Sequence, residues 1–296
     1  MLVRSDLFLY AVADGAGGHR SGEVASALAA RSIENYFGAT VRRTHNQPEF
    51  DRFGMATGAR RLSAAILKAN ADVMEIARSS PEHRGMGTTV VAACFSPRSA
   101  MMHVGHAGDS RCYRLRAGHL EQLTQDHSLF TDVLEQRPEL EDAQLERIPK
   151  NVVTRALGFD PKLRISLRSH AVVAGDRFLL CSDGLTGMVQ TATIAEIMSE
   201  KAAPEAIVHR LLAAANSGGG RDNISVLVVE CTDGPVSDSV PPPTARELAM
   251  GREADMGDPE LLILGIEELE SINAASASDE LLLALEGLVT RDSKKP

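Results

Sequence analysis

The chain has 296 residues, of which 44% are hydrophobic and 24% are charged, as in a globular protein of one large domain or two ordinary ones. Its formal net charge of −9 argues against a nucleic-acid-binding protein, which needs a basic face. No apolar run is long enough to span a membrane, and the N-terminus lacks the pattern of a secretory signal. We therefore expect a cytoplasmic protein without nucleic-acid or membrane partners.

The cysteines support this expectation. Cys94, Cys112, Cys181 and Cys231 lie far apart, mostly within strand-like runs, and show no zinc-like spacing with histidine. We expect reduced, buried thiols, which suits a cytoplasmic protein.

The first element in the chain is a strand that ends at an aspartate. Residues 7–13 are apolar and rich in aromatic and β-branched side chains, and Asp14 follows, with three glycines in the next four positions. A carboxylate beside freely turning backbone can present side-chain and main-chain oxygens to a hard cation such as Mg²⁺ or Mn²⁺. The alternative is a tight Asp-Gly turn between two elements.

Two helices follow this strand. The apolar spacing predicts a helix over residues 21–37, a polar irregular segment over 38–55 and a second helix over 58–78. Both helices have one apolar face, which indicates a helical layer packed on a sheet.

The middle of the chain alternates short strands with tight turns. Strands are expected at residues 90–95, 100–104, 112–115 and 120–123, and this spacing favours an antiparallel meander. Residues 129–150 are charged and helix-prone with little apolar face, so we expect them to cross the surface.

The remaining core repeats the arrangement of the opening strand. Residues 163–173 and 177–182 read as strands, and the second of them ends at an Asp-Gly pair. Helices are expected at 194–199 and 204–215, followed by a strand over 224–229.

Four aspartates stand where a core strand meets a turn, each with glycine close by: Asp14, Asp109, Asp183 and Asp222. Crowded carboxylates repel one another and become partly protonated unless a divalent ion removes that cost. A pair of ions bridged by one carboxylate would lower the pKa of a water and direct it at a phosphorus atom. We find no Ser-His-Asp or Cys-His arrangement that competes with this chemistry.

At this point the sequence resembles the metal-dependent (PPM, or type 2C) protein serine/threonine phosphatases in their bacterial form, over about residues 7–231. Any one motif is weak, but seven occur in order. The motifs are Asp14-Gly15-Ala16-Gly17-Gly18-His19, Gly85-Met86-Gly87-Thr88-Thr89, Gly108-Asp109-Ser110-Arg111, Thr124-Gln125-Asp126-His127-Ser128, Thr154-Arg155-Ala156-Leu157-Gly158, Ser182-Asp183-Gly184-Leu185 and Asp222-Asn223-Ile224-Ser225.

The resemblance implies an α+β fold, a four-layer αββα sandwich of two antiparallel sheets flanked by helices. It implies two Mn²⁺ or Mg²⁺ ions at the rim between the sheets. Asp14 would bridge them, the carbonyl of Gly15 would bind the second ion, and Asp183 with Asp222 would complete the first. Asp109 and Asp183 would hold a third, weaker ion, and segment 129–150 would be a flap beside the site.

The implied activity is hydrolysis of phosphoserine and phosphothreonine on proteins, in opposition to a Ser/Thr kinase. The family's upstream Arg-x-x-Asn-x-Asp motif, whose arginine clamps the substrate phosphate, is not matched by Arg4 and Asp6 in spacing or context. Without the strand that carries this motif, a sheet edge would be open. Ala16 stands where some members carry histidine. The alternative is therefore a pseudophosphatase that binds a partner through the same fold.

For several other motif residues we expect a structural role in place of a catalytic one. His127 is expected to be structural, Arg111 and Arg155 to hydrogen-bond internal carboxylates, and Thr88 and Thr89 to form a junction before a strand.

The C-terminal region differs from the rest in composition. We expect a phosphatase domain over 1–234, a Pro-rich linker over 235–257 and an acidic, leucine-rich helical tail over 258–296. The residues after 234 carry 13 acidic and 5 basic side chains, nearly all of the net charge. Because so many leucines must pack somewhere, the tail is expected to dock on a partner or on the domain itself. The alternative is a floppy acidic extension.

Overall fold

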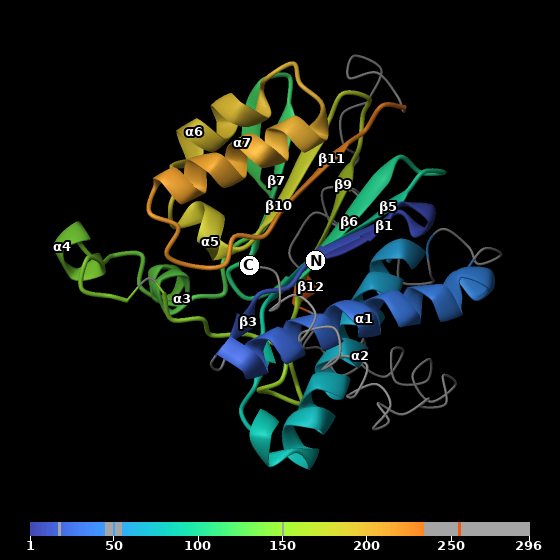
Figure 1. Cartoon of the computed structure of the whole chain (residues 1–296), viewed down its shortest axis with the longest axis vertical. Helices are drawn as coiled ribbons and strands as arrows, with labels where there is room; N and C mark the ends of the chain where they lie inside the picture. Colours follow the sequence, from blue (N-terminus) through green and yellow to red (C-terminus); the bar gives the residue numbers. More distant parts are fainter. Residues whose placement is uncertain (17–18, 45–49, 51–54, 150, 234–253, 256–296) are drawn as a thin grey trace, which may run out of the picture.

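The protein is described here from a computed structural model, which places residues 1–16, 19–44, 50, 55–149, 151–233 and 254–255. Two antiparallel sheets lie face to face, and helices cover the outer face of each (Figure 1). This arrangement confirms the predicted αββα sandwich.

The first sheet has six strands, and helices α1 (His19–Thr44) and α2 (Thr57–Ser79) pack on its outer face. All of its pairings are antiparallel. In spatial order the strands are β1 (Leu2–Arg4), β2 (Leu9–Val12), β5 (Val90–Ser96), β6 (Met101–Ala107), β9 (Ser166–Ala171) and β12 (Ala254–Asp255).

The second sheet has four strands, and three helices cover its outer face. In spatial order the strands are β11 (Val226–Glu230), β10 (Arg177–Cys181), β7 (Arg111–Arg116) and β8 (His119–Gln122). The helices are α5 (Asp183–Thr186), α6 (Thr191–Met198) and α7 (Pro204–Ser217).

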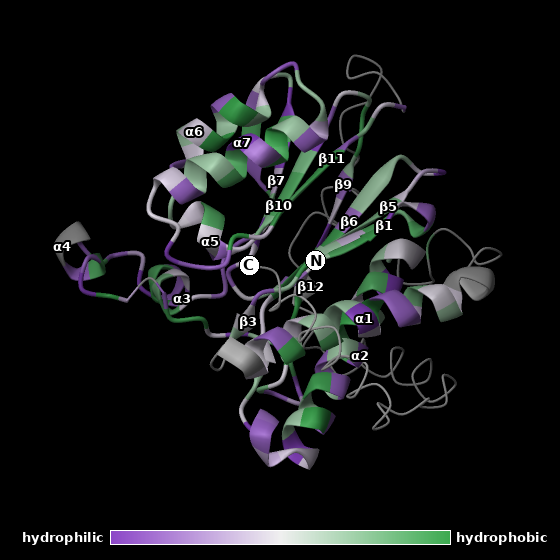
Figure 2. Ribbon diagram, in the orientation of Figure 1, coloured by the Kyte–Doolittle hydropathy of each residue, from purple (hydrophilic) through white to green (hydrophobic). Residues whose placement is uncertain are grey.

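Strand alternation explains why four layers form. Along β5, Val90 and Ala92 face the α1–α2 layer, whereas Val91 and Ala93 face the other sheet. Strand β10 does the same, because Phe178 packs between the sheets, whereas Leu179 packs under the helices. Figure 2 shows the resulting hydrophobic colour concentrated on the strands and on the inward sides of the helices.

Helix α1 is longer than the sequence predicts. It continues to Thr44, through residues expected to be irregular. The extension packs on α2, since Arg61 lies over the ring of Phe37 at 4.1 Å and its Nε donates to Thr40 Oγ1 at 2.8 Å. Tertiary packing therefore overrides the polar composition of this segment.

Two short strand pairs were not predicted. Strand β1 pairs with β2 and occupies the sheet edge that we expected to be open. Its three residues still leave Val3 58% exposed. Strands β3 (Gly15–Ala16) and β4 (Gly87–Thr88) form a separate two-stranded sheet, which links the glycine turn after Asp14 to the segment before β5.

The described part of the predicted surface segment, residues 129–149, contains the short helices α3 (Leu129–Gln136) and α4 (Asp142–Leu145) and crosses the surface as expected (Figure 1). Ser128 caps α3, because its Oγ accepts from Thr131 N at 3.3 Å. These helices project from the same end of the sandwich as α5 and β3 (Figure 1).

The cysteines are free thiols, as predicted. Cys94, Cys112 and Cys181 are buried, and Cys231 is half-buried. Burial raises the pKa of the Cys94 and Cys181 thiols to about 12 each.

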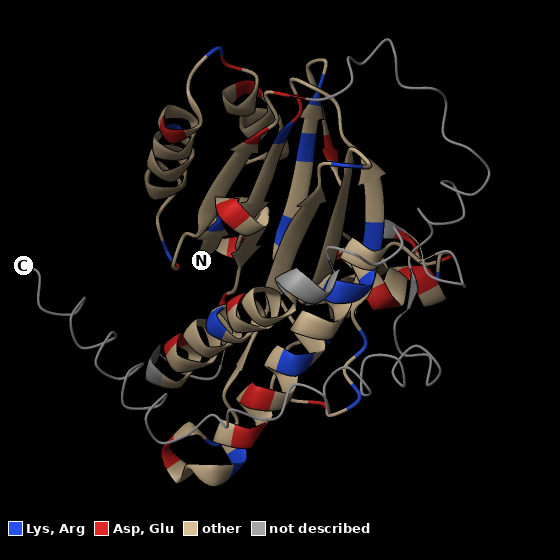
Figure 3. Cartoon of the chain, turned by 90° about the vertical axis from the view of Figure 1, so that its right-hand side faces the viewer, with Lys and Arg blue, Asp and Glu red and all other residues tan. Residues whose placement is uncertain are grey.

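Charged side chains of both signs are interspersed over the helices in the view of Figure 3. Among the described residues, no helix has the length and apolar character needed to cross a membrane. The predicted linker and tail lie outside the described residues, apart from Ala254–Asp255, which form β12 beside β9.

Candidate active site

The four predicted aspartates come from both sheets. Asp14 follows β2, and Asp109 lies in the turn between β6 and β7. Asp183 is the first residue of α5, two positions after the end of β10, and Asp222 precedes β11. Each sheet thus contributes the end of a core strand to the same neighbourhood, as the carboxyl interactions described below show.

Two threonines fix the backbone at Asp14. Thr88 Oγ1 and Thr89 N each donate to the carbonyl oxygen of Asp14 at 2.8 Å. Asp14 N donates to Thr89 Oγ1 at 3.3 Å, and that hydroxyl also bonds Ser110 Oγ at 2.7 Å. The Thr-Thr pair is therefore the strand junction that the sequence predicts, and it also anchors the first aspartate to the turn that carries Asp109.

Glycines allow the backbone segments of the site to approach closely. A Cβ on Gly15 would lie 2.1 Å from the carbonyl oxygen of Gly22 in α1. Gly108 has φ +113°, a conformation that favours glycine, and a Cβ there would lie 2.6 Å from Thr89 Cβ. These contacts require glycine at both positions.

A third close approach joins the other two aspartates. A Cβ on Gly184 would lie 2.3 Å from the carbonyl oxygen of Asn223. Ser182 Oγ donates to that same oxygen at 3.2 Å and accepts from Ser225 N at 3.0 Å. The start of α5 and the loop before β11 are therefore held together, with Asp183 and Asp222 on adjoining backbone.

The carboxyl groups interact strongly. Burial is the main cause that raises the pKa of Asp14 to about 7. The carboxyl group of Asp183 raises it further, and the charges of Asp222 and Asp109 add smaller contributions. Burial, followed by the charge of Asp183, raises the pKa of Asp109 to about 6. These shifts indicate a group of acids that favours a cation.

One oxygen in this group has no partner of its own. Among the described residues, Asp183 Oδ1 is buried without a hydrogen bond. A buried, unpaired carboxylate oxygen is costly unless a hydrogen-bond donor or a cation satisfies it. The donor set therefore fits a hard divalent ion, which binds oxygen ligands.

The four aspartates do not form a complete metal coordination shell in this structure. Within the described part of the chain, no three carboxylate, imidazole or thiol side chains meet as a cluster able to enclose an ion. Asp14 and Asp183 come together and Asp109 lies near Asp183. Asp222, however, is exposed and its Oδ1 accepts from Asn223 N at 2.7 Å.

The supporting residues follow the sequence analysis in part. Arg111 donates to both carboxylate oxygens of Asp126, as expected, with the shortest distance 2.7 Å. The prediction for Arg155 is wrong, because its Nη1 lies 3.3 Å from the ring Nε2 of His127 rather than at a carboxylate. His127 is buried and stacks on His106, with ring centroids 4.5 Å apart, in a structural role.

Arg4 does not take the place of the family's clamping arginine. Its guanidinium pairs with Asp6 at 2.7 Å and with Glu34 in α1 at 2.5 Å. This agrees with the mismatch in spacing that the sequence shows.

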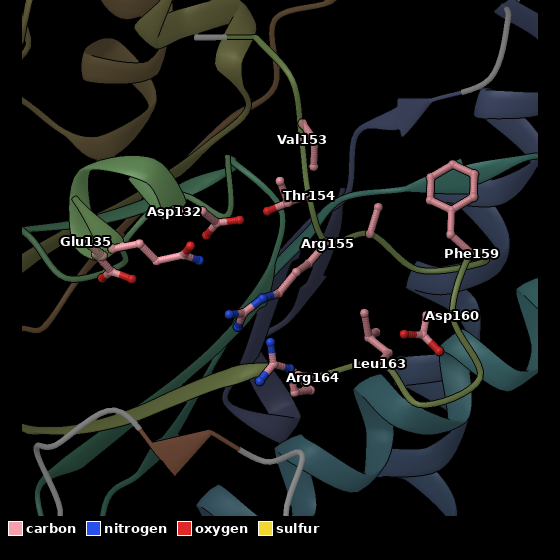
Figure 4. A pocket seen from close by; sticks show the side chains of 11 residues that line it. Asp132, Glu135, Val153, Thr154, Arg155, Phe159, Asp160, Leu163 and Arg164 are labelled. Atoms are coloured by element: carbon pink, nitrogen blue, oxygen red, sulfur yellow. The ribbon is translucent and has the colours of Figure 1, made fainter. Parts of the chain in front are cut away.

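Sequence reasoning did not anticipate a cavity beside α3. A cavity of about 310 Å³ lies between α3 and residues 153–164, and Figure 4 shows the side chains around it. A second cavity of about 190 Å³ shares Asp132, Glu135 and Arg155 with the first. A sequence signal was present, because the Thr-Arg-Ala-Leu-Gly motif supplies part of the wall.

Comparison with known proteins finds relatives over most of the chain. The sequence profile of the family described as protein phosphatase 2C matches residues 3–205. The serine/threonine phosphatase stp of Listeria innocua is 35% identical over 219 residues, which is 74% of this chain and 82% of that protein. The serine/threonine protein phosphatase PstP of Mycobacterium tuberculosis is 33% identical over 227 residues, 76% of this chain and 40% of that protein.

A solved structure extends the likeness to three dimensions. The catalytic domain of serine/threonine protein phosphatase PstP, in complex with two manganese ions, has a TM-score of 0.62 and 33% identity. The similarity covers 76% of this chain and 88% of that one. The chain described here belongs to the protein phosphatase 2C family.

Proposed function

We propose that this protein is a metal-dependent phosphatase that removes phosphate from phosphoserine and phosphothreonine on proteins. The observation that supports this most directly is the buried Asp183 Oδ1, which has no hydrogen-bond partner among the described residues and lies in a group of acids that raises the pKa of Asp14. The family, and the manganese ions in the PstP structure, point to the same chemistry.

We assign the ligands of two divalent ions, Mn²⁺ or Mg²⁺, to this group. Asp14 would bridge them, the carbonyl oxygen of Gly15 would serve the second, and Asp183 with Asp222 would serve the first. Asp109, together with Asp183, would hold a third ion. The buried, unpaired Asp183 Oδ1 supports this assignment, as does the raised pKa of Asp14. Bound there, the ions would supply a water of lowered pKa and would polarise the phosphate oxygens.

The residues around this group hold the carboxylates in place. Thr88 and Thr89 fix the main chain of Asp14, and Ser182 fixes the loop that carries Asp222. These hydrogen bonds fix the backbone that carries the carboxylates, whereas the Asp222 side chain would turn from Asn223 N toward the other acids to bind a cation.

The test is phosphate release from a phosphothreonine peptide by the full chain. We expect release that depends on added Mn²⁺ and stops when a chelator is added. Asp183→Asn should lower kcat/KM by at least about a hundredfold, because it removes a ligand charge at the centre of the group. Glu196→Gln, on the exposed side of α6, is the matched control and should keep full activity.

Two outcomes would contradict the proposal. One is a folded full chain that releases no phosphate at any Mn²⁺ concentration, which would favour the binding-module alternative. The other is an Asp183→Asn protein with undiminished activity, which would place the chemistry elsewhere.

Finer points of the function are proposals of the same kind. Opposition to a Ser/Thr kinase follows from the substrate class, and a cytoplasmic location suits the free thiols. The domain boundary near residue 234 and a docking role for residues 258–296 remain predictions. Deleting residues 235–296 without any change in partner binding, oligomeric state or activity would remove the docking role.

A further inference from the structure

The turn that carries Asp109 is held on both sides. After it, Ser110 Oγ bonds Thr89 Oγ1 at 2.7 Å. Before it, Gly108 has φ +113°, and both of its backbone polar groups bond to His127. His127 N donates to the carbonyl oxygen of Gly108 at 3.0 Å, and Gly108 N donates to His127 Nδ1 at 3.2 Å. The main chain next to Asp109 is therefore fixed by the side chain of His127, which the assignment of metal ligands does not use.

These contacts determine where the imidazole of His127 carries its proton. The backbone amide of Gly108 can only donate, so Nδ1 is unprotonated and accepts. The proton therefore lies on Nε2, which donates to Ser166 Oγ on β9 at 2.9 Å. Arg155 Nη1 also lies 3.3 Å from Nε2, but a guanidinium has no acceptor, so Ser166 is the partner of this proton. The ring thus links the turn between β6 and β7 to β9 through one acceptor and one donor.

His106 fixes the plane of this ring. The two imidazoles stack with an interplanar angle of 7°, and His106 Nε2 donates to the carbonyl oxygen of Gln125 at 2.7 Å. Both histidines are buried. Burial is the main cause that lowers the pKa of His127 to about 2, and His106 and neighbouring arginines lower it further. The ring is therefore neutral at neutral pH, and its Nδ1 stays an acceptor.

Asp109 needs such an anchor because its carboxyl group lies close to another acid. Burial, followed by the charge of Asp183, raises the pKa of Asp109 to about 6, so that its ionisation brings two like charges together. Without a cation, this repulsion favours any movement of the turn that separates the two carboxylates. The two hydrogen bonds between Gly108 and His127 oppose such a movement, because both would have to break.

We propose that His127 is a positioning residue for Asp109, and that its Nδ1 sets the affinity of the weaker divalent ion assigned to Asp109 and Asp183. This inference rests on the proposed function. His127 touches neither the ion nor the substrate, and it acts through the backbone of Gly108. Groups that orient a metal ligand in this way contribute about ten- to a hundredfold to metal affinity.

The test measures Mn²⁺ binding to the full chain by calorimetry, without substrate. His127→Asn keeps an acceptor close to the position of Nδ1 and loses the donor to Ser166, whereas His127→Gln keeps that donor and loses the acceptor. We expect His127→Gln to weaken the weaker Mn²⁺ site about tenfold or more, and His127→Asn to weaken it by less than about threefold. His119, which is exposed on β8, gives the matched control His119→Gln, which should bind Mn²⁺ like the wild type.

Two further measurements separate positioning from a general loss of structure. The Gly108 amide of the wild type should be protected from hydrogen exchange before Mn²⁺ is added, and it should exchange faster in His127→Gln than in His127→Asn. In an Asp109→Asn background, which removes a ligand of the weaker site, the remaining Mn²⁺ sites should have the same affinity with and without His127→Gln. Thermal unfolding by circular dichroism verifies that each variant is folded.

Several results would overturn the inference. Unchanged Mn²⁺ affinity in folded His127→Gln would do so, as would an equal loss in the Asn and Gln variants or a further loss in the Asp109→Asn background. Fast exchange of the Gly108 amide in the metal-free wild type would overturn it without any variant. An active wild type that binds no weaker ion contradicts this inference alone, whereas a wild type without Mn²⁺-dependent phosphate release defeats the proposed function. The two failures are therefore distinguishable.

Discussion

Replacing Asp14 with asparagine should stabilise the metal-free protein while it removes metal-dependent activity. In the folded chain the pKa of Asp14 is raised from its ordinary value of 3.8 to about 7, first by burial and then by Asp183. Between these two values the folded state binds more protons than the unfolded state, so that stability falls as pH rises from about 4 to about 7. The asparagine side chain would carry no charge and would keep hydrogen-bonding contact with Asp183.

The size of the effect follows from that shift. Each pKa unit corresponds to about 1.4 kcal/mol, which sets a ceiling of about 4 kcal/mol. Asp14 is only half-buried, and solvent screening reduces the figure to about 1–2 kcal/mol. For a domain of this size, such a change raises Tm by roughly 2–8 °C. The gap between variant and wild type should be smallest near about pH 4 and largest above about pH 7.

Urea unfolding in the presence of a chelator, repeated across this pH range, measures the effect, with Glu196→Gln as the surface control. Mn²⁺ should stabilise the wild type and leave Asp14→Asn unchanged. If the variant were less stable than the wild type at every pH, or if the pH dependence of the two proteins were the same, the argument from carboxylate crowding would be wrong.

Three further predictions can be checked on the same protein. Gly184→Ala places a Cβ 2.3 Å from a neighbouring carbonyl oxygen. It should lower the free energy of unfolding in urea by about 1–3 kcal/mol and lower kcat/KM more than tenfold. The control Gly38→Ala, whose Cβ meets nothing within 4 Å, should be neutral or stabilising. Arg116→Ala removes the charged partner of the fully buried Asp176 and leaves it only the backbone N–H of Val173. It should cost about 3–5 kcal/mol, measured in the same way. Mn²⁺ affinity by calorimetry should rise up to about tenfold per pH unit until about pH 7, as a proton leaves Asp14.

Much of the fold could be predicted because its signals are local. Strands β5 and β10 are continuous apolar runs bounded by turns, and α2 has a clean apolar face, so these elements lie where the sequence places them. The motif order then identified the sandwich. Helix α1 was underestimated because its last turns are held by Arg61 of another helix, a contact that periodicity does not contain.

The candidate site was likewise predictable from the sequence only in part. The positions of Asp14 and Asp183 at strand ends were visible in the sequence, since a carboxylate followed by glycine marks such an end. The distances between them depend on hydrogen bonds between remote segments, such as those from Thr88 and Thr89 to Asp14. The cavity beside α3 depends on how this helix lies against the later loop, and no local pattern specifies that.

The buried thiols have a practical consequence for studying this protein. Cys94 belongs to β5 of the first sheet, whereas Cys112 and Cys181 belong to β7 and β10 of the second. With pKa values raised by burial, they react slowly with alkylating reagents until their strands separate. Mass spectrometry of alkylated peptides would therefore report, without any introduced label, which sheet opens first when the cation is withdrawn.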